Sequence, residues 1–196
     1  MFRRLITTAV AAALFAVLVP AALAVNVHVR VEGKTTTIFG SAEPTLTTGA
    51  TALDALDAAS MAGEFYYHLA PGPFVDQIGR YPGVGFSGWG YKVNGVSPPI
   101  AANQALLKDG DTVLWYWTTF TAQGSSPTLL LRRAARRNCY RVLSQNDTGV
   151  ATPAGSATLR VDGRRVRARA GRACIGKHRG LVRATAPDAV RSNAIR

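Results

Sequence analysis

Residues 88–95 read Gly-Trp-Gly-Tyr-Lys-Val-Asn-Gly, and residues 107–116 read Leu-Lys-Asp-Gly-Asp-Thr-Val-Leu-Trp-Tyr. In the first stretch Trp89 and Tyr91 alternate with small or polar residues, which is the period-two pattern of a β-strand. That stretch ends in Asn-Gly, a pair that strongly favours a tight turn. The second stretch contains the turn sequence Asp-Gly-Asp and then enters a long apolar segment, Thr112–Phe120. We therefore expect two strands here.

The strand expected over Thr112–Phe120 is apolar on both faces. One face carries Val113, Trp115 and Trp117, and the other carries Leu114, Tyr116 and Phe120. A sheet with a helix on one face normally keeps its opposite face polar, so this strand needs a second cover. The cover is either intramolecular, from loop 70–88 or from the C-terminal half, or it is a binding partner. In the second case the candidate ligand-binding residues are Trp89, Tyr91, Trp115 and Tyr116.

Trp89 and Tyr91 differ in what they are expected to contact. A strand that begins in glycine needs an anchor, so Trp89 is expected in the core. Tyr91 is expected at the surface, because its hydroxyl can reach water.

Upstream of these strands, the sequence predicts a hairpin and one helix. Four valines alternate with polar residues over 25–32, and a turn and a β-branched segment follow. Thr51 and Asp54 have the spacing of a capping box, and a helix of about three turns is expected to end near Gly63. Residues 25–121 are therefore expected to form an α+β fold, a β-grasp-like sheet covered by one helix. An unspecified α+β sandwich is the alternative.

A linker and an all-β segment are expected beyond residue 121. Residues 122–127 are rich in Gly, Ser and Pro, the composition of a linker. Short extended runs separated by turn residues fill 128–196 with no helix pattern between them. This spacing predicts a small all-β, sandwich-like domain with little core.

Charge and cysteine content distinguish the two halves. Residues 25–121 contain five Lys or Arg and eight Asp or Glu, whereas residues 122–196 contain sixteen and three. Cys139 and Cys174 both lie in the basic half. In an exported protein they are expected to form a disulfide that braces this half, with two free thiols as the alternative.

The basic half also carries a concentrated stripe of arginine. Arg165, Arg167 and Arg169 share one face of a predicted strand. They are the candidate residues for contact with an anionic surface, such as an envelope polymer. The alternative is that they only keep an edge strand soluble and unpaired.

The N-terminus has the parts of a secretory signal peptide. Arg3 and Arg4 precede an uncharged apolar run, and Ala22-Leu23-Ala24 supplies the small residues that signal peptidase accepts. We predict that residues 1–24 are removed and that the mature chain begins at Val25. An uncleaved membrane anchor is the rival interpretation. The mature chain is expected to be secreted, either free or associated with the cell surface, and not an integral membrane protein.

No pattern in the sequence predicts catalysis or metal binding. His28, His68 and His178 are scattered and belong to no zinc or nucleophile motif. Asp109 and Asp111 flank a glycine, which is turn chemistry rather than a calcium site. Export and the lack of aromatic residues among the arginines argue against nucleic acid. We therefore expect no enzyme, no metal and no nucleic-acid partner.

The two stretches quoted first, 88–95 and 107–116, resemble the transcobalamin-like C-terminal domain. This β-grasp module occurs in animal cobalamin carriers and in many bacterial secreted proteins, and the resemblance covers about 25–121. In the animal carriers the corrinoid is held between this module and a large helical barrel. The sequence has no such barrel, so cobalamin is a weaker alternative ligand and no other cofactor is implied. Residues 156–193 resemble the small Ig-like or carboxypeptidase-regulatory-like sandwich appended to bacterial members, which serves as a spacer or adhesive unit.

These observations lead to two functional hypotheses. The first is a secreted, non-enzymatic binding module that presents an aromatic β-grasp surface to a ligand or a cell-envelope partner. That partner would be an anionic polymer or another surface protein. The second is a structural or adhesive envelope spacer without a small ligand.

Overall fold

The structure is a computed structural model that describes residues 24–196, so the predicted signal peptide, residues 1–24, lies outside the described residues except for Ala24. Strands take up 47% of the described residues and helix 7%. The predicted α+β class is therefore wrong, because this part of the chain is mostly β and forms several small sheets with one helix. Strands of two to four residues at 45–48, 81–82, 151–153 and 194–195 were not predicted, since so few side chains show no period.

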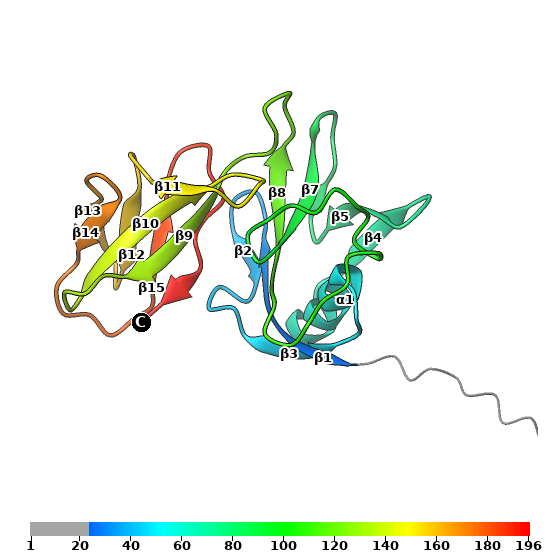
Figure 1. Ribbon diagram of the computed structural model, residues 1–196, viewed down its shortest axis with the longest axis horizontal. Helices are drawn as coiled ribbons and strands as arrows, with labels where there is room; N and C mark the ends of the chain where they lie inside the picture. Colours follow the sequence, from blue (N-terminus) through cyan, green and yellow to red (C-terminus); the bar gives the residue numbers. More distant parts are fainter. Residues whose placement is uncertain (1–23) are drawn as a thin grey trace, which may run out of the picture.

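The largest sheet has five strands: β1 (Val25–Glu32), β2 (Thr37–Phe39), β3 (Thr45–Thr48), β7 (Ser87–Val93) and β8 (Thr112–Thr119). On one side β1 pairs antiparallel with β2 and β3, and on the other it pairs parallel with β8. β8 then pairs antiparallel with β7, which is an edge strand (Figure 1). The predicted hairpin of β1 and β2 is confirmed.

The helix α1 (Ala52–Gly63) packs against one face of this sheet (Figure 1). Its N-terminus is the predicted capping box. The Asp54 main-chain N–H donates to the Thr51 hydroxyl at 3.2 Å, and the Asp54 carboxylate accepts from the Thr51 main-chain N–H at 2.9 Å. The buried residues of the helix and of the sheet form one core: Val27, Val29, Val31, Ala52, Ala55, Leu56, Ala59, Trp89, Val113 and Trp115.

A three-stranded sheet closes this core at one end. It consists of β4 (Tyr67–Ala70), β5 (Phe74–Ile78) and β6 (Tyr81–Pro82). Val75 and Ile78 of β5 belong to the same core as Trp89. This packing brings the turn between β4 and β5 close to the edge strand β7.

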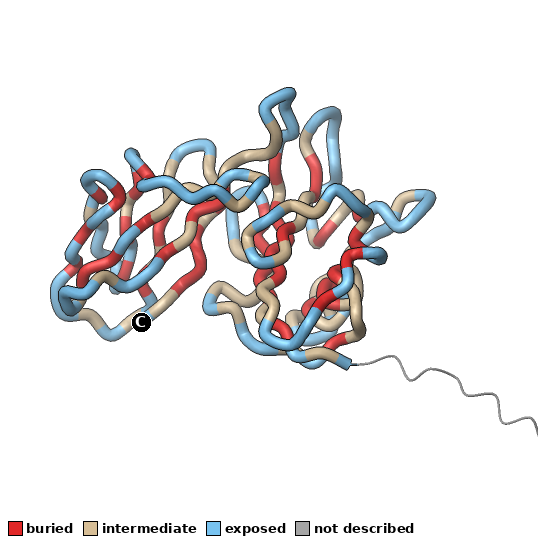
Figure 2. The backbone as a smooth tube through the Cα atoms, viewed as in Figure 1, coloured by how far each residue is buried: buried red, intermediate tan, exposed pale blue. Residues whose placement is uncertain are grey.

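The C-terminal part contains two four-stranded sheets that share one core. The first consists of β9 (Thr128–Arg133), β10 (Cys139–Gln145), β11 (Ala151–Pro153) and β14 (Arg172–Cys174). The second consists of β12 (Thr158–Val161), β13 (Arg164–Arg167), β15 (Val182–Thr185) and β16 (Ala194–Ile195). The predicted disulfide between Cys139 and Cys174 is present and joins β10 to β14. Buried residues follow the strands of both parts (Figure 2).

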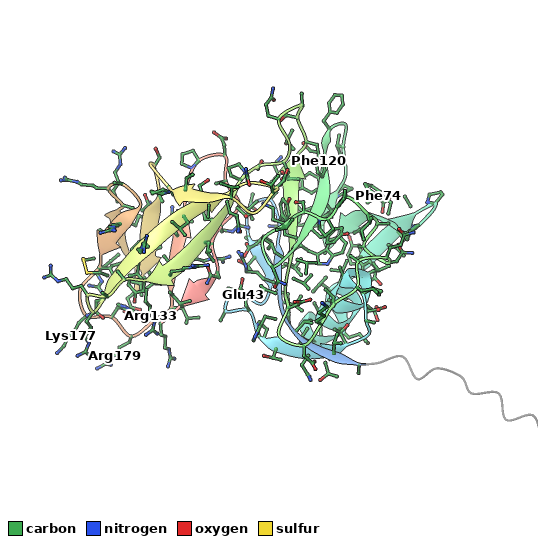
Figure 3. The ribbon with its side chains drawn as sticks, viewed as in Figure 1. Glu43, Phe74, Phe120, Arg133, Lys177 and Arg179 are labelled. Carbon is green, nitrogen blue, oxygen red and sulfur yellow. A yellow bond between two sulfur atoms is a disulfide. The ribbon has the colours of Figure 1, made fainter. Side chains whose placement is uncertain are left out.

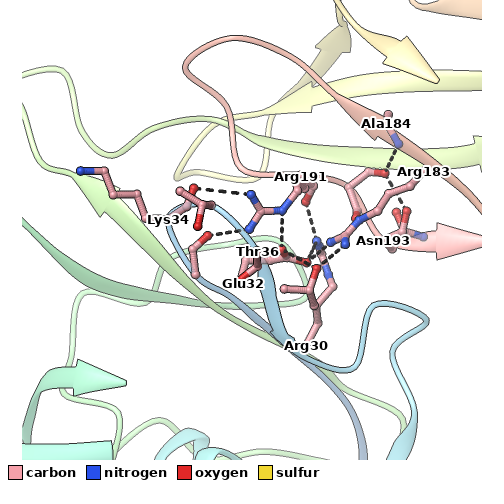
Figure 4. Close-up of polar contacts among 12 residues, drawn as sticks. Arg30, Glu32, Lys34, Thr36, Arg183, Ala184, Arg191 and Asn193 are labelled. Atoms are coloured by element: carbon pink, nitrogen blue, oxygen red, sulfur yellow. Dashed lines mark hydrogen bonds and ion pairs between the residues drawn. The ribbon is translucent and has the colours of Figure 1, made fainter. Parts of the chain in front are cut away.

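A buried ionic cluster joins the two parts of the chain (Figure 4). Glu32, on β1, has no solvent exposure. Its carboxylate accepts from Arg30 at 3.2 Å, from Arg191 at 3.0 Å and from Arg183. Arg183 and Arg191 come from the C-terminal part, about 150 residues away in sequence. The interface is further closed by the Arg191 guanidinium, which donates to the main-chain oxygen of Gly33 at 2.6 Å.

A second polar contact lies at the other end of the same interface. The buried Lys92 ammonium lies 3.5 Å from Asp147 and donates to the main-chain oxygen of Asn146 at 2.8 Å. Burial lowers the pKa of Lys92, although the Asp147 charge opposes this shift. Burial acts to raise the pKa of Asp147, but hydrogen bonds from Ser125 and the charge of Lys92 outweigh it, so this pKa lies below its usual value.

The second cover of β8 is intramolecular. Leu114 and Tyr116, on the face turned away from α1, are buried and cluster with Val190 of the C-terminal part. Of the two interpretations of this apolar face, the structure shows that the C-terminal part lies on it.

Candidate functional site

A pocket of about 400 Å3 lies at the free edge of β7. Its walls come from the 71–75 turn, from β7 and β8, and from the 97–102 connection. All four predicted ligand-binding residues line it: Trp89, Tyr91, Trp115 and Tyr116. The volume is within the range of small-molecule binding sites.

Trp89 and Trp115 form fixed walls of the pocket. They are 3% and 2% exposed, and both belong to the core. The Trp89 indole N–H donates to the main-chain oxygen of Tyr81 at 2.8 Å, and the Trp115 indole N–H donates to that of Ala52 at 3.1 Å. Because both indole N–H groups already donate to main-chain oxygens, neither ring would gain a hydrogen bond by turning into the pocket. The prediction that Trp89 lies in the core is confirmed.

Tyr91 connects β7 to the segment that passes beside it. Its ring stacks on Trp115 with the centroids 5.3 Å apart, and its hydroxyl donates to the main-chain oxygen of Ile100 at 2.7 Å. The side chain is half-buried, and burial raises the pKa of its hydroxyl. Tyr91 therefore fixes the position of the 97–102 wall rather than projecting into water as an isolated surface residue.

Tyr116 reaches the pocket from the opposite face of the sheet. A Cβ atom at Gly90 would lie 3.2 Å from the tip of the Tyr116 ring, so glycine at this position lets the ring lie close over β7. The Tyr116 hydroxyl and the Ser125 hydroxyl are 2.8 Å apart. Asp147 accepts from the Ser125 main-chain N–H at 2.8 Å and from the Ser97 hydroxyl at 3.2 Å. These groups give the pocket one polar end.

The rim of the pocket is apolar and exposed. Phe74 is 60% exposed, Ile100 47% and Phe120 42%. Figure 3 shows Phe74 on β5 and Phe120 at the end of β8, on the same side of the molecule. Large apolar side chains exposed together around a cavity are typical of a binding surface.

The edge of β7 also offers main-chain hydrogen-bonding groups beside the pocket. Asn94 donates its main-chain N–H to the Thr112 oxygen at 2.8 Å, and in an antiparallel pair only alternate residues exchange such bonds. Even-numbered residues of β7 therefore bond to β8, while Trp89 and Tyr91 turn their N–H and C=O groups outward. Among residues 24–196 these four groups have no hydrogen-bond partner.

The predicted arginine stripe lies apart from this pocket. Arg165 and Arg167 are exposed on β13, and Arg169 is exposed just beyond it. β13 is an edge strand that pairs only with β12. The geometry is compatible with both interpretations of the stripe, anion contact and protection of an edge.

Several lining residues were not predicted from the sequence. They are Phe74, Ser97, Pro98, Ile100, Ser125 and Asp147. Phe120 was assigned to a strand face but not to the site. In the sequence, the signal for these residues was the pair of proline-rich turns at 71–73 and 98–99, because such turns connect strands at the edge of a sheet. A proline-rich turn alone does not indicate a pocket.

Two other features are absent from the part of the chain that the structure describes. No three His, Cys, Asp or Glu side chains gather there to hold a metal ion. No helix there has the length and the apolar character needed to cross a membrane.

Comparison with known proteins finds a match for one segment of the chain. Residues 49–119, from just before α1 to the end of β8, match the model of a domain of unknown function, DUF4430, which is grouped with transcobalamin-like domains. This segment contributes most of the pocket but not β1, β2, β3 or the C-terminal part. No curated protein matches the chain significantly. The same is true of the solved structures.

Proposed function

We propose that this protein is a secreted, non-enzymatic binding protein that takes an apolar ligand into the pocket at the edge of β7. The observation that carries the proposal is the position of the four aromatic residues singled out from the sequence, which all line one pocket rimmed by exposed apolar side chains. Such a pocket removes apolar ligand surface from water, the main source of affinity for small molecules. The signal-peptide pattern supports export.

The pocket favours a ligand that is apolar over most of its surface and polar along one edge. Its aromatic walls suit a flat ring or a branched aliphatic group. The unpaired main-chain groups of Trp89 and Tyr91 suit amide-like donors and acceptors on that group. A ligand with both features would bury its apolar surface against the aromatic walls and at the same time form hydrogen bonds with the main chain of β7.

The resemblance of 88–95 and 107–116 to transcobalamin-like domains, and the family match of 49–119, support a binding role. The size of the pocket, however, argues against enclosure of a corrinoid. A corrinoid macrocycle exceeds a cavity of about 400 Å3, so it would rest on the rim with most of its surface in water.

The alternative function is a structural spacer, and the ionic cluster around Glu32 favours it. A buried carboxylate that accepts from three arginines fixes the two parts of the chain relative to each other. A rigid link of this kind suits a spacer, which has to keep whatever is attached to its two parts at a fixed separation. The pocket has no purpose in this alternative.

The test is a titration of the mature protein with 1-N-phenylnaphthylamine, an uncharged apolar dye whose fluorescence rises in apolar sites. An uncharged probe avoids attraction to the basic half. The double variant Phe74→Ser, Phe120→Ser removes two rim side chains and should weaken dye binding about tenfold or more. Phe86→Ser is the matched control, because Phe86 is 83% exposed and does not line the pocket.

Equal dye binding by the rim variant and the control would contradict the proposal and leave the spacer function. A parallel titration with cyanocobalamin, followed by its visible absorbance, tests the weaker ligand alternative. Tight cobalamin binding that the rim variant abolishes would establish a corrinoid site at the rim and overturn the choice of a smaller ligand.

A further inference from the structure

A second pocket of about 400 Å3 lies in the C-terminal part, and its walls are strongly basic. It is formed by the turn between β9 and β10 and by the loop that follows β14. Figure 3 shows Arg133, Lys177 and Arg179 gathered at the end of the molecule remote from Phe74 and Phe120. The side chains that line the pocket include Arg133, Arg136, Arg137, His178 and Arg179, and no aspartate or glutamate.

These arginines have no acidic partner among residues 24–196. None of the four forms an ion pair, whereas Arg30, Arg183 and Arg191 all contact Glu32. The nearby acid Asp162 instead accepts from the main-chain N–H groups of Arg179 and Gly180, both at 3.0 Å. Like charges held around one cavity repel each other, and an anion placed among them removes that repulsion.

The turn that carries Arg136 and Arg137 is held in place. The Cys139 main-chain N–H donates to the Arg136 oxygen at 3.1 Å, which closes the turn. The Ile175 main-chain N–H donates to the Asn138 oxygen at 3.0 Å, and the disulfide ties Cys139 to the neighbouring strand. The arginines therefore project from fixed backbone rather than from a free tail.

The second segment that lines the pocket is fixed as well. Arg164 donates to the main-chain oxygens of Ile175 at 3.0 Å and Lys177 at 2.6 Å. His178 lies between the Tyr140 hydroxyl at 2.7 Å and the Gly180 oxygen at 3.0 Å. The loop that presents Arg179 is thus held on both sides, which reduces the entropy lost on binding.

We propose that this distal basic pocket binds phosphate groups of a linear polyanion. Guanidinium groups come from two separate segments of the chain, an arrangement that suits a tetrahedral anion with oxygens in several directions better than a planar carboxylate. Two rings line the wall: Tyr140 is buried, and His178 is half-buried, tilted against Tyr140, with both ring nitrogens within hydrogen-bond distance of protein oxygens. The wall therefore offers no fully exposed ring on which a nucleobase could stack. The site is independent of the aromatic pocket, and neither needs the other to be occupied.

The experiment measures binding of the mature protein to sodium polyphosphate in physiological salt. The double variant Arg136→Ala, Arg137→Ala is compared with Lys34→Ala, Lys108→Ala, which removes the same charge from two exposed lysines of the N-terminal part that do not line the pocket. The pocket variant should weaken binding about tenfold or more, whereas the control should change it by about twofold or less. All four side chains are exposed, and unchanged melting temperatures will show that both variants fold.

Competition identifies the group that is bound. Inorganic phosphate should displace the polymer at concentrations where chloride of equal ionic strength does not. Polyglutamate of similar charge should bind more weakly than polyphosphate, and a single-stranded oligonucleotide should show no preference for base composition. The proposal would be overturned if both double variants lost the same affinity for polyphosphate, or if chloride displaced the polymer as well as phosphate does. It would also be overturned if polyglutamate bound as tightly as polyphosphate, or if oligonucleotide binding depended on base composition.

Discussion

Replacing Glu32 by Gln should destabilise the whole protein, because this carboxylate is the common partner of three arginines at the interface. The change keeps the size of the side chain and removes its charge. Arg30, Arg183 and Arg191 would then remain close together with only Glu43 to balance them, 3.1 Å from Arg30.

The magnitude follows from how deeply each group is buried. Removing one partner of a buried ion pair typically costs about 3–5 kcal/mol, since the other charge stays out of water. Glu32 and Arg30 are buried, but the side chains of Arg183 and Arg191 are 18% and 19% exposed, so water can compensate them in part. We therefore expect about 3 kcal/mol, a large share of the roughly 5–15 kcal/mol that holds a typical protein folded.

Urea unfolding followed by two signals measures this cost. All three tryptophans lie in the N-terminal part, so their fluorescence follows that part alone, whereas far-ultraviolet circular dichroism follows the strands of both. Glu43→Gln is the matched control, because Glu43 contacts only Arg30 in the cluster and its side chain is 22% exposed. It should cost about 1 kcal/mol or less.

The two signals also test whether the cluster couples the parts. In the unmodified protein they should give one transition, and in Glu32→Gln they should separate. A cost below about 1 kcal/mol for Glu32→Gln, or the same cost for both variants, would show that the cluster is not a main source of interface stability. Superimposable signals in the variant would show that other contacts suffice to couple the parts.

Three further outcomes are expected from unfolding measurements. Trp89→Ala should lower the free energy of unfolding by about 3–5 kcal/mol, as other large-to-small core changes do, whereas Phe86→Ala should change it by less than about 0.5 kcal/mol; equal effects would contradict the core position of Trp89. Replacing Cys139 and Cys174 together by Ser should destabilise the C-terminal part by about 3–4 kcal/mol, because the bond closes a loop with a sequence separation of 35; earlier loss of tryptophan fluorescence than of circular dichroism would contradict this. The pKa of Asp147 is lowered in the folded protein, so the contribution of this carboxylate to the free energy of unfolding should be complete above pH 3.8, the ordinary pKa of an aspartate, and should be lost as the pH falls below that value. An Asp147→Asn variant whose stability falls in acid as much as that of the unmodified protein would refute that assignment.

Strong local patterns predicted the elements that local chemistry determines. The capping box of Thr51 and Asp54, the alternation over β1 and the two apolar faces of β8 each depend on neighbouring residues. The fold class was predicted wrongly because the one helix was recognised in the sequence while several strands of two to four residues were not. Such strands are set by their partners, as β3 is by β1, and their own sequence shows little.

The candidate site was predicted in its aromatic members and missed in its shape. Trp89, Tyr91, Trp115 and Tyr116 were found because large rings on facing strands are visible as a pattern. The rest of the wall comes from turns that reach the edge of β7 only after the chain has folded. What was expected as an aromatic surface is therefore a pocket whose tryptophans are buried and whose exposed members, such as Phe74, were not in the pattern.

The arginines of the C-terminal part show why charge alone does not assign function. Arg183 and Arg191 hold the interface through Glu32, a partner more than 150 positions earlier, and no count of charges identifies them. Arg136 and Arg179 belong to the same basic half, yet fixed turns bring them to one cavity whose wall contains no aspartate or glutamate. A cation with a buried carboxylate beside it helps to hold the fold, whereas cations that line a polar cavity and form no ion pair are candidates for binding an anion. The distinction depends on which acid the fold places next to each arginine, and that is settled only by contacts between residues far apart in the chain.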